Sequence, residues 1–484
     1  DENKLPLAEE AFQNSLAIAP DRESTLINLS TVLILGEKWG NACEITTRLL
    51  ELNPNSYDGY INLATVYSHL ENSDLALEAI EKAISLDSDC YKGWCNKGNI
   101  LLDLFDQKEA LLCFDKAIQL NSLSAESYIG RANARNYFKR YKDALADLNK
   151  ALEIDPSNHK IKFNKGLSLI RIGEFEEGWE LFEHRLFVLG TKQNQNFSHI
   201  PRWIRNKTLS NKSLLVYSEQ GFGDCIQFAR YLPLLLEDNP STRVTLLTPP
   251  PLEALMRTLH QNITIETNEQ VVRNRNFDLQ CPIMSLAYNF KTTLSNIPSN
   301  IPYLSIDQNS IKKWQVYLEN NTNQRKLYSF DSNRLRVGLC WEGSGKYATQ
   351  SNPRRNVPFP LIHELTQELS RKIPSIEFHS LQINSNPKAL PNEIHSHIDR
   401  LSNFYETGGL IKNLDLVISV DTAVAHLSGA LGVPTYLLLP DPPDFLSMSH
   451  GVTHHWYPKT KLFRQIQPND WSAPLCSIKE ELID

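Results

Sequence analysis

The sequence predicts an α-solenoid followed by two α/β lobes, and two observations lead to this prediction. Small residues recur every 34 positions through the first third of the chain, which is typical of stacked helical pairs. After Pro201, short runs of β-forming residues alternate with helical segments, which is typical of parallel sheets covered by helices. A chain of 484 residues is also long enough for two or three domains.

The repeat is defined by a series of small residues. That series runs through Ala8, Ala42, Ala76, Ala110, Ala144 and Gly178. Seven positions later stand Ser15, Leu49, Ala83, Ala117 and Ala151, and a loop position carries Pro20, Pro54, Ser88, Ser122 and Pro156. Small side chains let two antiparallel helices touch, and Pro or Ser ends the second helix. The pattern resembles the tetratricopeptide repeat, closely over residues 57–158 and more weakly over 1–56 and 159–190.

We assign residues 1–190 to this array and expect a protein or peptide partner on its concave face. The candidate groove residues are polar positions of the first helices, namely Asn62, Asn96, Lys97, Arg131 and Arg135. Each is equally well explained as part of a solvated face, so the array alone identifies no partner. The chain starts at Asp1, without a methionine, and its first repeat is half a repeat, as expected of a fragment of a longer protein.

Composition excludes several classes of function. The net charge of −7 argues against a general binder of nucleic acid or anionic membranes. No apolar run reaches the roughly 18–20 residues of a membrane-spanning helix. The eight cysteines show no zinc-site spacing, so we expect reduced thiols, no metal site and a cytoplasmic protein.

Two α/β lobes are expected, at residues 196–325 and 330–484, joined by a polar connector. The expected strands are 214–218, 243–248, 263–266 and 277–281 in the first lobe, and 336–341, 376–382, 416–419 and 435–439 in the second. The expected helices are 225–236, 251–259, 359–369, 406–413 and 423–431. Alternation of this kind predicts doubly wound, Rossmann-like sheets, whose ligands bind beyond the carboxyl ends of the strands. Between two lobes, that place is the cleft.

The first candidate loop lies between the first strand and helix of the first lobe. Its glycines, Gly221 and Gly223, allow a sharp turn and a close approach to a ligand, and Gln220 precedes them. Asp224 then begins a helix and faces the cleft. The alternative interpretation makes Asp224 an ordinary first-turn carboxylate.

The second candidate loop follows a buried strand of the second lobe. Asp421 and Thr422 precede a helix whose free N–H groups suit a diphosphate, and His426 lies one turn further along. The alternative is that Asp421 and Thr422 are simple helix caps and His426 is an ordinary helix histidine.

Six motifs in order resemble bacterial proteins that join tetratricopeptide repeats to a transferase module of the heptosyltransferase superfamily. They occupy residues 177–185, 220–233, 337–343, 380–382, 414–432 and 456–465. The overall plan is also similar to that of the O-linked N-acetylglucosamine transferases. The resemblance implies a GT-B fold, with acceptor on the first lobe and nucleotide sugar on the second. It further implies transfer with inversion and without a metal or cofactor, to a glycan, lipid or protein hydroxyl.

The resemblance also assigns roles to residues. Asp224 is the implied general base, and Asp421, Thr422 and His426 surround the diphosphate. Basic residues after the second lobe's first strand meet the phosphates; here these are Lys346, Arg354 and Arg355, with Arg355 the best match. Gln382 faces the nucleotide.

One departure from the family keeps alternatives open. The loop at 441–450 lacks the arginine that many relatives carry there. The alternative function is therefore a non-catalytic repeat scaffold that carries a degenerate transferase module. Another alternative is a protein glycosyltransferase whose repeats hold the target peptide.

Overall fold

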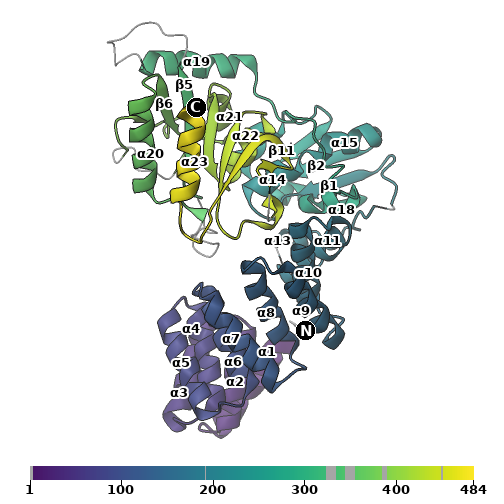
Figure 1. Ribbon diagram of the computed structural model, residues 1–484. Coiled ribbons are helices and arrows are strands. Elements are labelled where there is room, and N and C mark those ends of the chain that lie inside the picture. The colour runs from purple at the N-terminus through teal and green to yellow at the C-terminus, as the bar shows by residue number, and fades with distance from the viewer. Residues whose placement is uncertain are drawn as a thin grey trace. The chain divides into compact units, whose positions relative to one another are not determined.

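The computed structural model describes residues 4–190, 192–205, 207–322, 334–343, 355–383, 390–448 and 451–483 (Figure 1). The chain divides into two compact units, Asp1–Ser168 and Leu169–Asp484. Among the expected site residues, Lys346 lies outside the described residues, as does Arg354. No helix in the described ranges is both long and apolar enough to cross a bilayer. All eight cysteines are free thiols.

The first unit is built from helices that pack in consecutive antiparallel pairs. The helices are α1 (Leu5–Ile18), α2 (Glu23–Leu35), α3 (Trp39–Leu52), α4 (Tyr57–His69), α5 (Ser73–Leu86), α6 (Tyr91–Asp103), α7 (Gln107–Leu120), α8 (Ala125–Tyr137) and α9 (Tyr141–Ile154), and α10 (His159–Ile172) follows. This order confirms the predicted solenoid of tetratricopeptide repeats.

The 34-residue period has a direct structural cause. The alanines of the defining series, Ala42, Ala76, Ala110 and Ala144, have no exposed surface. They lie where the two helices of a pair touch, so that a larger side chain would separate the backbones. The turn inside each pair repeats as well, because Glu37, Glu71, Phe105 and Lys139 all have positive φ, at the position that Gly173 takes in the last pair.

Four of the five expected groove residues have polar partners within the repeat unit. Arg131 and Arg135 both pair with the carboxylate of Asp147, whose side chain is 4% exposed. Lys97 pairs with Glu81, and the Asn62 amide donates to Ser30. The two arginines therefore brace α8 against α9, which is a structural role that the sequence analysis did not weigh.

The last helix of the repeat series, α11 (Phe175–Phe182), is part of the second unit. After α10 the chain forms α11 and the short helices α12 (Arg185–Val188) and α13 (Lys192–Asn196). Trp179 and Phe182 of α11 are 1% exposed. The indole of Trp179 contacts Phe228 and Trp456 edge-on, and these lie in the first and second lobes. The helix that carries Gly178, the last member of the repeat series, thus belongs to the core of the α/β unit.

The first lobe contains a four-stranded parallel sheet in the order β3-β2-β1-β4. Its strands are β1 (Ser213–Tyr217), β2 (Arg243–Leu247), β3 (Ile263–Glu266) and β4 (Leu279–Pro282). The expected helix at 225–236 is two helices, α14 (Phe222–Phe228) and α15 (Tyr231–Asp238), and short helices α16 (Glu253–Met256), α17 (Glu269–Arg273) and α18 (Leu286–Asn289) follow. β1 is the strand at which the order reverses, so its carboxyl end is a switch point.

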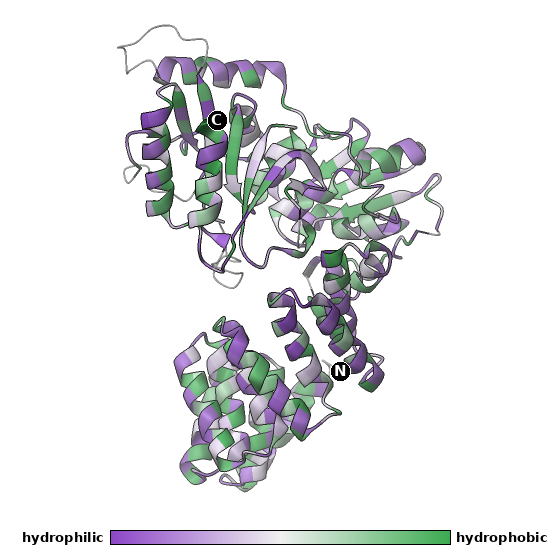
Figure 2. Ribbon diagram, in the orientation of Figure 1, coloured by the Kyte–Doolittle hydropathy of each residue, from purple (hydrophilic) through white to green (hydrophobic). Residues whose placement is uncertain are grey.

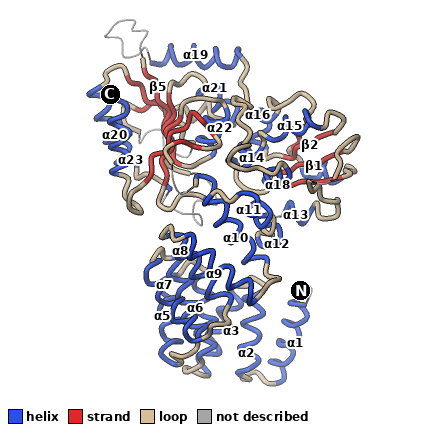
Figure 3. The backbone as a smooth tube through the Cα atoms, turned by 45° about the vertical axis from the view of Figure 1, so that its right-hand side comes forward, coloured by secondary structure: helices blue, strands red, loops and turns tan. Residues whose placement is uncertain are grey.

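The second lobe contains a seven-stranded sheet in the order β10-β11-β9-β8-β5-β6-β7, and only β10 runs antiparallel to its neighbour. The strands are β5 (Leu335–Cys340), β6 (Ile376–Ser380), β7 (Ile394–His395), β8 (Leu416–Val420), β9 (Thr435–Leu439), β10 (Thr453–His454) and β11 (Tyr457–Arg464). The helices are α19 (Gln308–Thr322), α20 (Phe359–Lys372), α21 (Phe404–Ile411), α22 (Ala423–Ala430) and α23 (Ser472–Ile483). Figure 3 shows the two groups of strands.

Burial follows the expected pattern of a doubly wound sheet. All five residues of β8 are buried, and hydrophobic residues predominate in the central strands β9, β8 and β5 of this lobe (Figure 2). The side chains of α20 and α23 join those of β5, β6 and β8 in one core cluster. The connector helix α19 packs on α21 of the second lobe, where Trp314 lies directly over Gly409. The C-terminal unit is thus an α/β region with two parallel sheets.

Candidate functional site

The two expected loops meet at the junction of the two lobes. α14 begins after β1 of the first lobe, and α22 begins after β8 of the second, so each helix starts at a carboxyl end of a strand. A Cβ built on Gly223 would lie 2.7 Å from His426 Cδ2 and 3.6 Å from Ala423 Cα. The phenyl ring of Phe222 also contacts Phe404 of the second lobe. Glycine at 223 therefore permits the two helix starts to touch.

Asp224 occupies the first turn of α14. Its Oδ2 accepts a hydrogen bond of 3.0 Å from the Gly221 N–H, which holds the carboxylate over the start of its own helix. Burial raises the pKa of Asp224 to about 7, and the negative charge of Asp444 adds to the effect. Gln220 and Gly221 form the rest of the turn, with Gly221 exposed and Gln220 partly exposed. The arrangement supplies a carboxylate that exchanges a proton near neutral pH.

Asp421, Thr422 and His426 surround the start of α22. His426 Nε2 lies 3.7 Å from Asp421 Oδ1, and His426 Nδ1 lies 3.2 Å from the Tyr457 hydroxyl. Thr422 is the N-cap residue, but its side chain makes no capping hydrogen bond, so the hydroxyl does not occupy the helix's first N–H groups. Burial and, to a lesser extent, the positive charge of Arg230 lower the pKa of His426 to about 4. The imidazole is therefore neutral at pH 7.

Arg355 and Gln382 lie at the neighbouring strand ends. The Arg355 guanidinium covers Gly343, since a Cβ built there would be 2.6 Å from Nη2. Burial raises the pKa of Asp421, and the positive charge of Arg355 opposes that shift. Gln382 is 4% exposed and bonds Glu342 twice: its amide accepts from the Glu342 N–H at 3.2 Å and donates to the Glu342 carbonyl at 3.0 Å. Gln382 thus shapes the turn after β5.

Arg230, which the sequence analysis missed, joins the lobes beneath these loops. It follows α14 and is 3% exposed. Its Nη1 donates to the carbonyl of Trp456 at 2.7 Å and to that of Pro298 at 3.1 Å. The guanidinium carbon lies 4.7 Å from the ring centre of Tyr457 and 4.8 Å from that of Tyr303. Because these partners lie far along the chain, no local pattern marked Arg230 as important.

The loop after β9 brings a third carboxylate to the site. Asp444 caps the short helix η6 (Phe445–Ser447) by accepting from the Leu446 N–H at 3.2 Å. Ser447 Oγ donates to Asp421 Oδ2 at 3.5 Å, and Phe445 packs on Phe182 of α11. This is the loop in which the expected arginine is missing. The negative charge of Asp444 helps to raise the pKa of Asp224. Burial and the charge of Asp421 in turn raise the pKa of Asp444.

Comparison with known families supports the repeat half of the chain. Tetratricopeptide-repeat models match residues 46–78, and also 91–122 and 125–158. The chain contains tetratricopeptide repeats. The matches at 91–122 and 125–158 coincide with the helical pairs α6–α7 and α8–α9, in which Ala110 and Ala144 are buried. Sequence period, structure and family model agree there.

Individual relatives are more distant. Protein FlbA of Caulobacter vibrioides is 25% identical over 355 residues, which make up 67% of this chain and 55% of FlbA. The chain thus spans about half the length of that relative. A thermophilic TPR protein of Thermus thermophilus is similar at 20% identity over 35% of this chain and 92% of that one, with a TM-score of 0.33. YrrB, described as a TPR protein with an unusual peptide-binding site, is similar at 20% identity over 39% of this chain and 98% of that one, with a TM-score of 0.28.

Proposed function

We propose that this protein is an inverting glycosyltransferase of the GT-B type. It transfers a sugar from a nucleotide sugar to a hydroxyl of a glycan, lipid or protein, without a metal or cofactor. The observation that supports the proposal is the meeting of Asp224 on one lobe with Asp421, Thr422 and His426 on the other. The repeat array binds a protein or peptide, which is the acceptor or a partner, and the enzyme acts in the cytoplasm.

The second lobe holds the donor. The N–H groups in the first turn of α22 and the Thr422 hydroxyl donate to the diphosphate, and Arg355 supplies positive charge. These groups stabilise the negative charge that the nucleoside diphosphate gains as it leaves. Neutral His426 donates or accepts a single hydrogen bond there without adding charge.

The reaction needs a base on the opposite side of the sugar, and Asp224 serves in that role. The acceptor oxygen attacks the anomeric carbon and forms the new C–O bond as the bond to the diphosphate breaks. The bonding electrons leave with the nucleoside diphosphate, and the hydroxyl proton passes to Asp224. A pKa of about 7 suits this role, because part of the carboxylate is ionised at neutral pH and its proton affinity is higher than that of an exposed aspartate.

The test is a transfer assay with nucleotide sugars based on UDP, GDP, ADP and CMP, read by mass spectrometry. We expect Asp224→Asn to lower turnover by at least about a hundredfold, the usual contribution of a general base, while nucleotide affinity stays nearly unchanged. The matched control is Asp238→Asn, an exposed aspartate at the end of α15 in the same lobe. Equal turnover in the two variants would exclude Asp224 as the base.

A second candidate function rests on Asp444. Its carboxylate adds a second acidic group beside Asp421, where the donor diphosphate would bind. An additional negative charge there weakens diphosphate binding, which favours a repeat scaffold with a degenerate transferase module. Thermal-shift measurements with UDP, GDP and ADP separate the two functions, because a ligand that binds the folded state raises the melting temperature. Stabilisation by none of them would favour the scaffold.

A further inference from the structure

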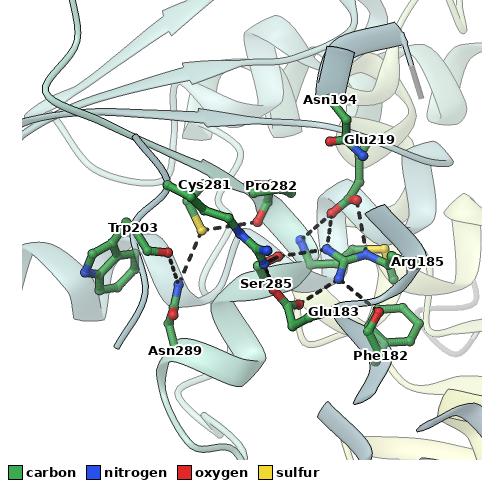
Figure 4. A network of polar contacts seen from close by, with 12 residues as sticks. Phe182, Glu183, Arg185, Asn194, Trp203, Glu219, Cys281, Pro282, Ser285 and Asn289 are labelled. Carbon is green, nitrogen blue, oxygen red and sulfur yellow. Dashed lines mark hydrogen bonds and ion pairs between the residues drawn. The ribbon is translucent and has the colours of Figure 1, made fainter. Parts of the chain in front are cut away.

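A buried ion pair ties the last repeat helices to the first candidate loop (Figure 4). The Arg185 side chain is 1% exposed, and so is that of Glu219. Arg185 Nη2 donates to Glu219 Oε1 at 2.7 Å, and Arg185 Nε donates to Glu219 Oε2 at 3.1 Å. The planar fork of the guanidinium therefore matches both carboxylate oxygens, which fixes orientation as well as distance.

The surrounding groups complete the coordination of this pair. Arg185 Nη2 also donates to Ser285 Oγ at 2.8 Å, and Arg185 Nη1 donates to Glu183 Oε1 at 2.7 Å. Glu219 Oε1 accepts a further bond of 3.2 Å from the Met284 N–H, after β4. Figure 4 shows Glu219 reaching from the loop toward Arg185, with Ser285 and Glu183 around the guanidinium. A pair satisfied to this degree holds one geometry, because any shift of the loop would separate a buried charge from its partners.

Glu219 lies in the turn that carries Asp224. On its N-terminal side, the Ser218 N–H donates to the Leu247 carbonyl of β2 at 3.0 Å. On its C-terminal side, Gly221 donates to the Asp224 carboxylate itself. The ion pair in Figure 4 links this turn to the repeat-derived segment, whereas β1 fixes only the start of the turn.

We propose that Arg185 is a positioning residue for the transfer reaction, acting through Glu219 to hold the 218–224 turn and thereby Asp224. This inference rests on the proposed function, in which Asp224 is the base. It assigns the last repeat a part in the reaction: Arg185 follows α11, the helix that continues the 34-residue series through Gly178. The segment that ends the repeat series thus supplies a supporting residue of the site, within the C-terminal unit.

The experiment uses the full chain and a double variant, Arg185→Gln with Glu219→Gln, which removes both charges of the pair together. Glu183, which also pairs with Arg185, keeps its ion pair with Arg202 in this variant. Transfer kinetics then give kcat and the donor KM, and hydrogen exchange by mass spectrometry reports the protection of amides 218–228. The matched control is Arg275→Gln with Glu266→Gln, an ion pair of 2.7 Å in the same lobe that is partly exposed. Arg185→Lys is the conservative variant, since lysine keeps the charge without the fork.

We expect the double variant to lower kcat roughly tenfold or more while the donor KM stays within about twofold, because the donor site lies on the other lobe. Hydrogen exchange of amides 218–228 should become faster in the double variant. Arg185→Lys should keep more of the wild-type kcat than the double variant does. An unchanged kcat, or an equal loss in the control pair, would overturn the inference. If the wild-type protein transfers no sugar, the proposed function fails, and the exchange data alone then test whether the ion pair holds the turn. Unchanged protection of amides 218–228 in the double variant would show that it does not.

Discussion

Gly223 of the first lobe lies directly against the imidazole of His426 in the second. The distance of 2.7 Å from a Cβ at Gly223 to His426 Cδ2 is shorter than any ordinary contact between carbons. His426 has little freedom to retreat, because its Nδ1 lies 3.2 Å from the Tyr457 hydroxyl. The starts of α14 and α22 can therefore lie this close only because residue 223 carries no side-chain methyl group.

Gly223→Ala should disturb the site without unfolding either lobe. The added methyl must displace His426 or move α14 away from α22, which misplaces Asp224 relative to the donor. We expect transfer to fall roughly tenfold or more, since small displacements of reacting groups have effects of that size. Steady-state kinetics measure the effect. Gly40→Ala is the control, because nothing lies within 4 Å of a Cβ at that position in α3. Full activity of Gly223→Ala would show that the lobes do not act in this arrangement.

The pH dependence of transfer should follow Asp224. A base whose pKa is raised to about 7 is protonated and inactive in acid, so kcat/KM should rise with pH and level off above about pH 7. His426, with its pKa lowered to about 4, should add no second limb in the neutral range. The measurement is kcat/KM from about pH 5 to 9 with a stable donor. A rate independent of pH across that range would rule out this assignment.

The same carboxylate should make stability depend on pH. The pKa of Asp224 is about 7 in the folded protein and 3.8 as the reference value, so the folded state holds a proton that the unfolded chain releases between those values. The stabilisation from the protonated form is complete below pH 3.8 and is lost as pH rises through 7. Asp224→Asn should therefore match the wild type near pH 4 and be more stable at pH 8, by up to about 4 kcal/mol.

Denaturant unfolding at the two pH values measures this difference, with Asp238→Asn as the control for loss of an exposed carboxylate. An equal gain in unfolding free energy at both pH values would show that ionisation of Asp224 is not the cause.

The repeat unit was predictable because its contacts are local. Ala76 and Ala110 are buried against the helices next to their own in the chain, so one period in the sequence determines their environment. Strand positions of the central sheets were predicted within a residue or two, as at Ile263–Glu266 and Thr435–Leu439. β11 was not predicted as a strand, because two lysines interrupt its apolar pattern: Lys459 is exposed and Lys461 is partly exposed.

The site was predictable in part, for the same reason. Asp224 and Asp421 each follow a buried strand, so each could be placed locally at a strand end. Their proximity depends on the packing of α14 against α22, which lie about two hundred residues apart in the sequence. Motif spacing along the chain does not predict contacts at that separation. Arg230 and Glu219 escaped notice because their partners, Trp456 and Arg185, lie in other parts of the chain. The structure therefore identifies the distant partners of buried charged residues, which the sequence does not reveal.

The core of the repeat unit offers a test that is independent of any reaction. Phe114 of α7 has no exposed surface and lies between two glycines, Gly98 of α6 and Gly130 of α8. A Cβ on Gly130 would come within 2.2 Å of the Phe114 ring, and one on Gly98 within 2.8 Å. The ring therefore fills the space that both glycines leave, and it joins two successive repeats.

Gly130→Ala should destabilise the repeat unit even though alanine is the better helix former. Overpacking of a full core costs about 1–3 kcal/mol, which exceeds the gain of up to about 1 kcal/mol in helix propensity. Phe114→Leu, which removes part of the ring, should destabilise the wild type but less so the alanine variant, giving a favourable coupling in a double-mutant cycle. Urea unfolding followed by circular dichroism measures all four proteins. Additive effects would show that the ring does not occupy the space at Gly130.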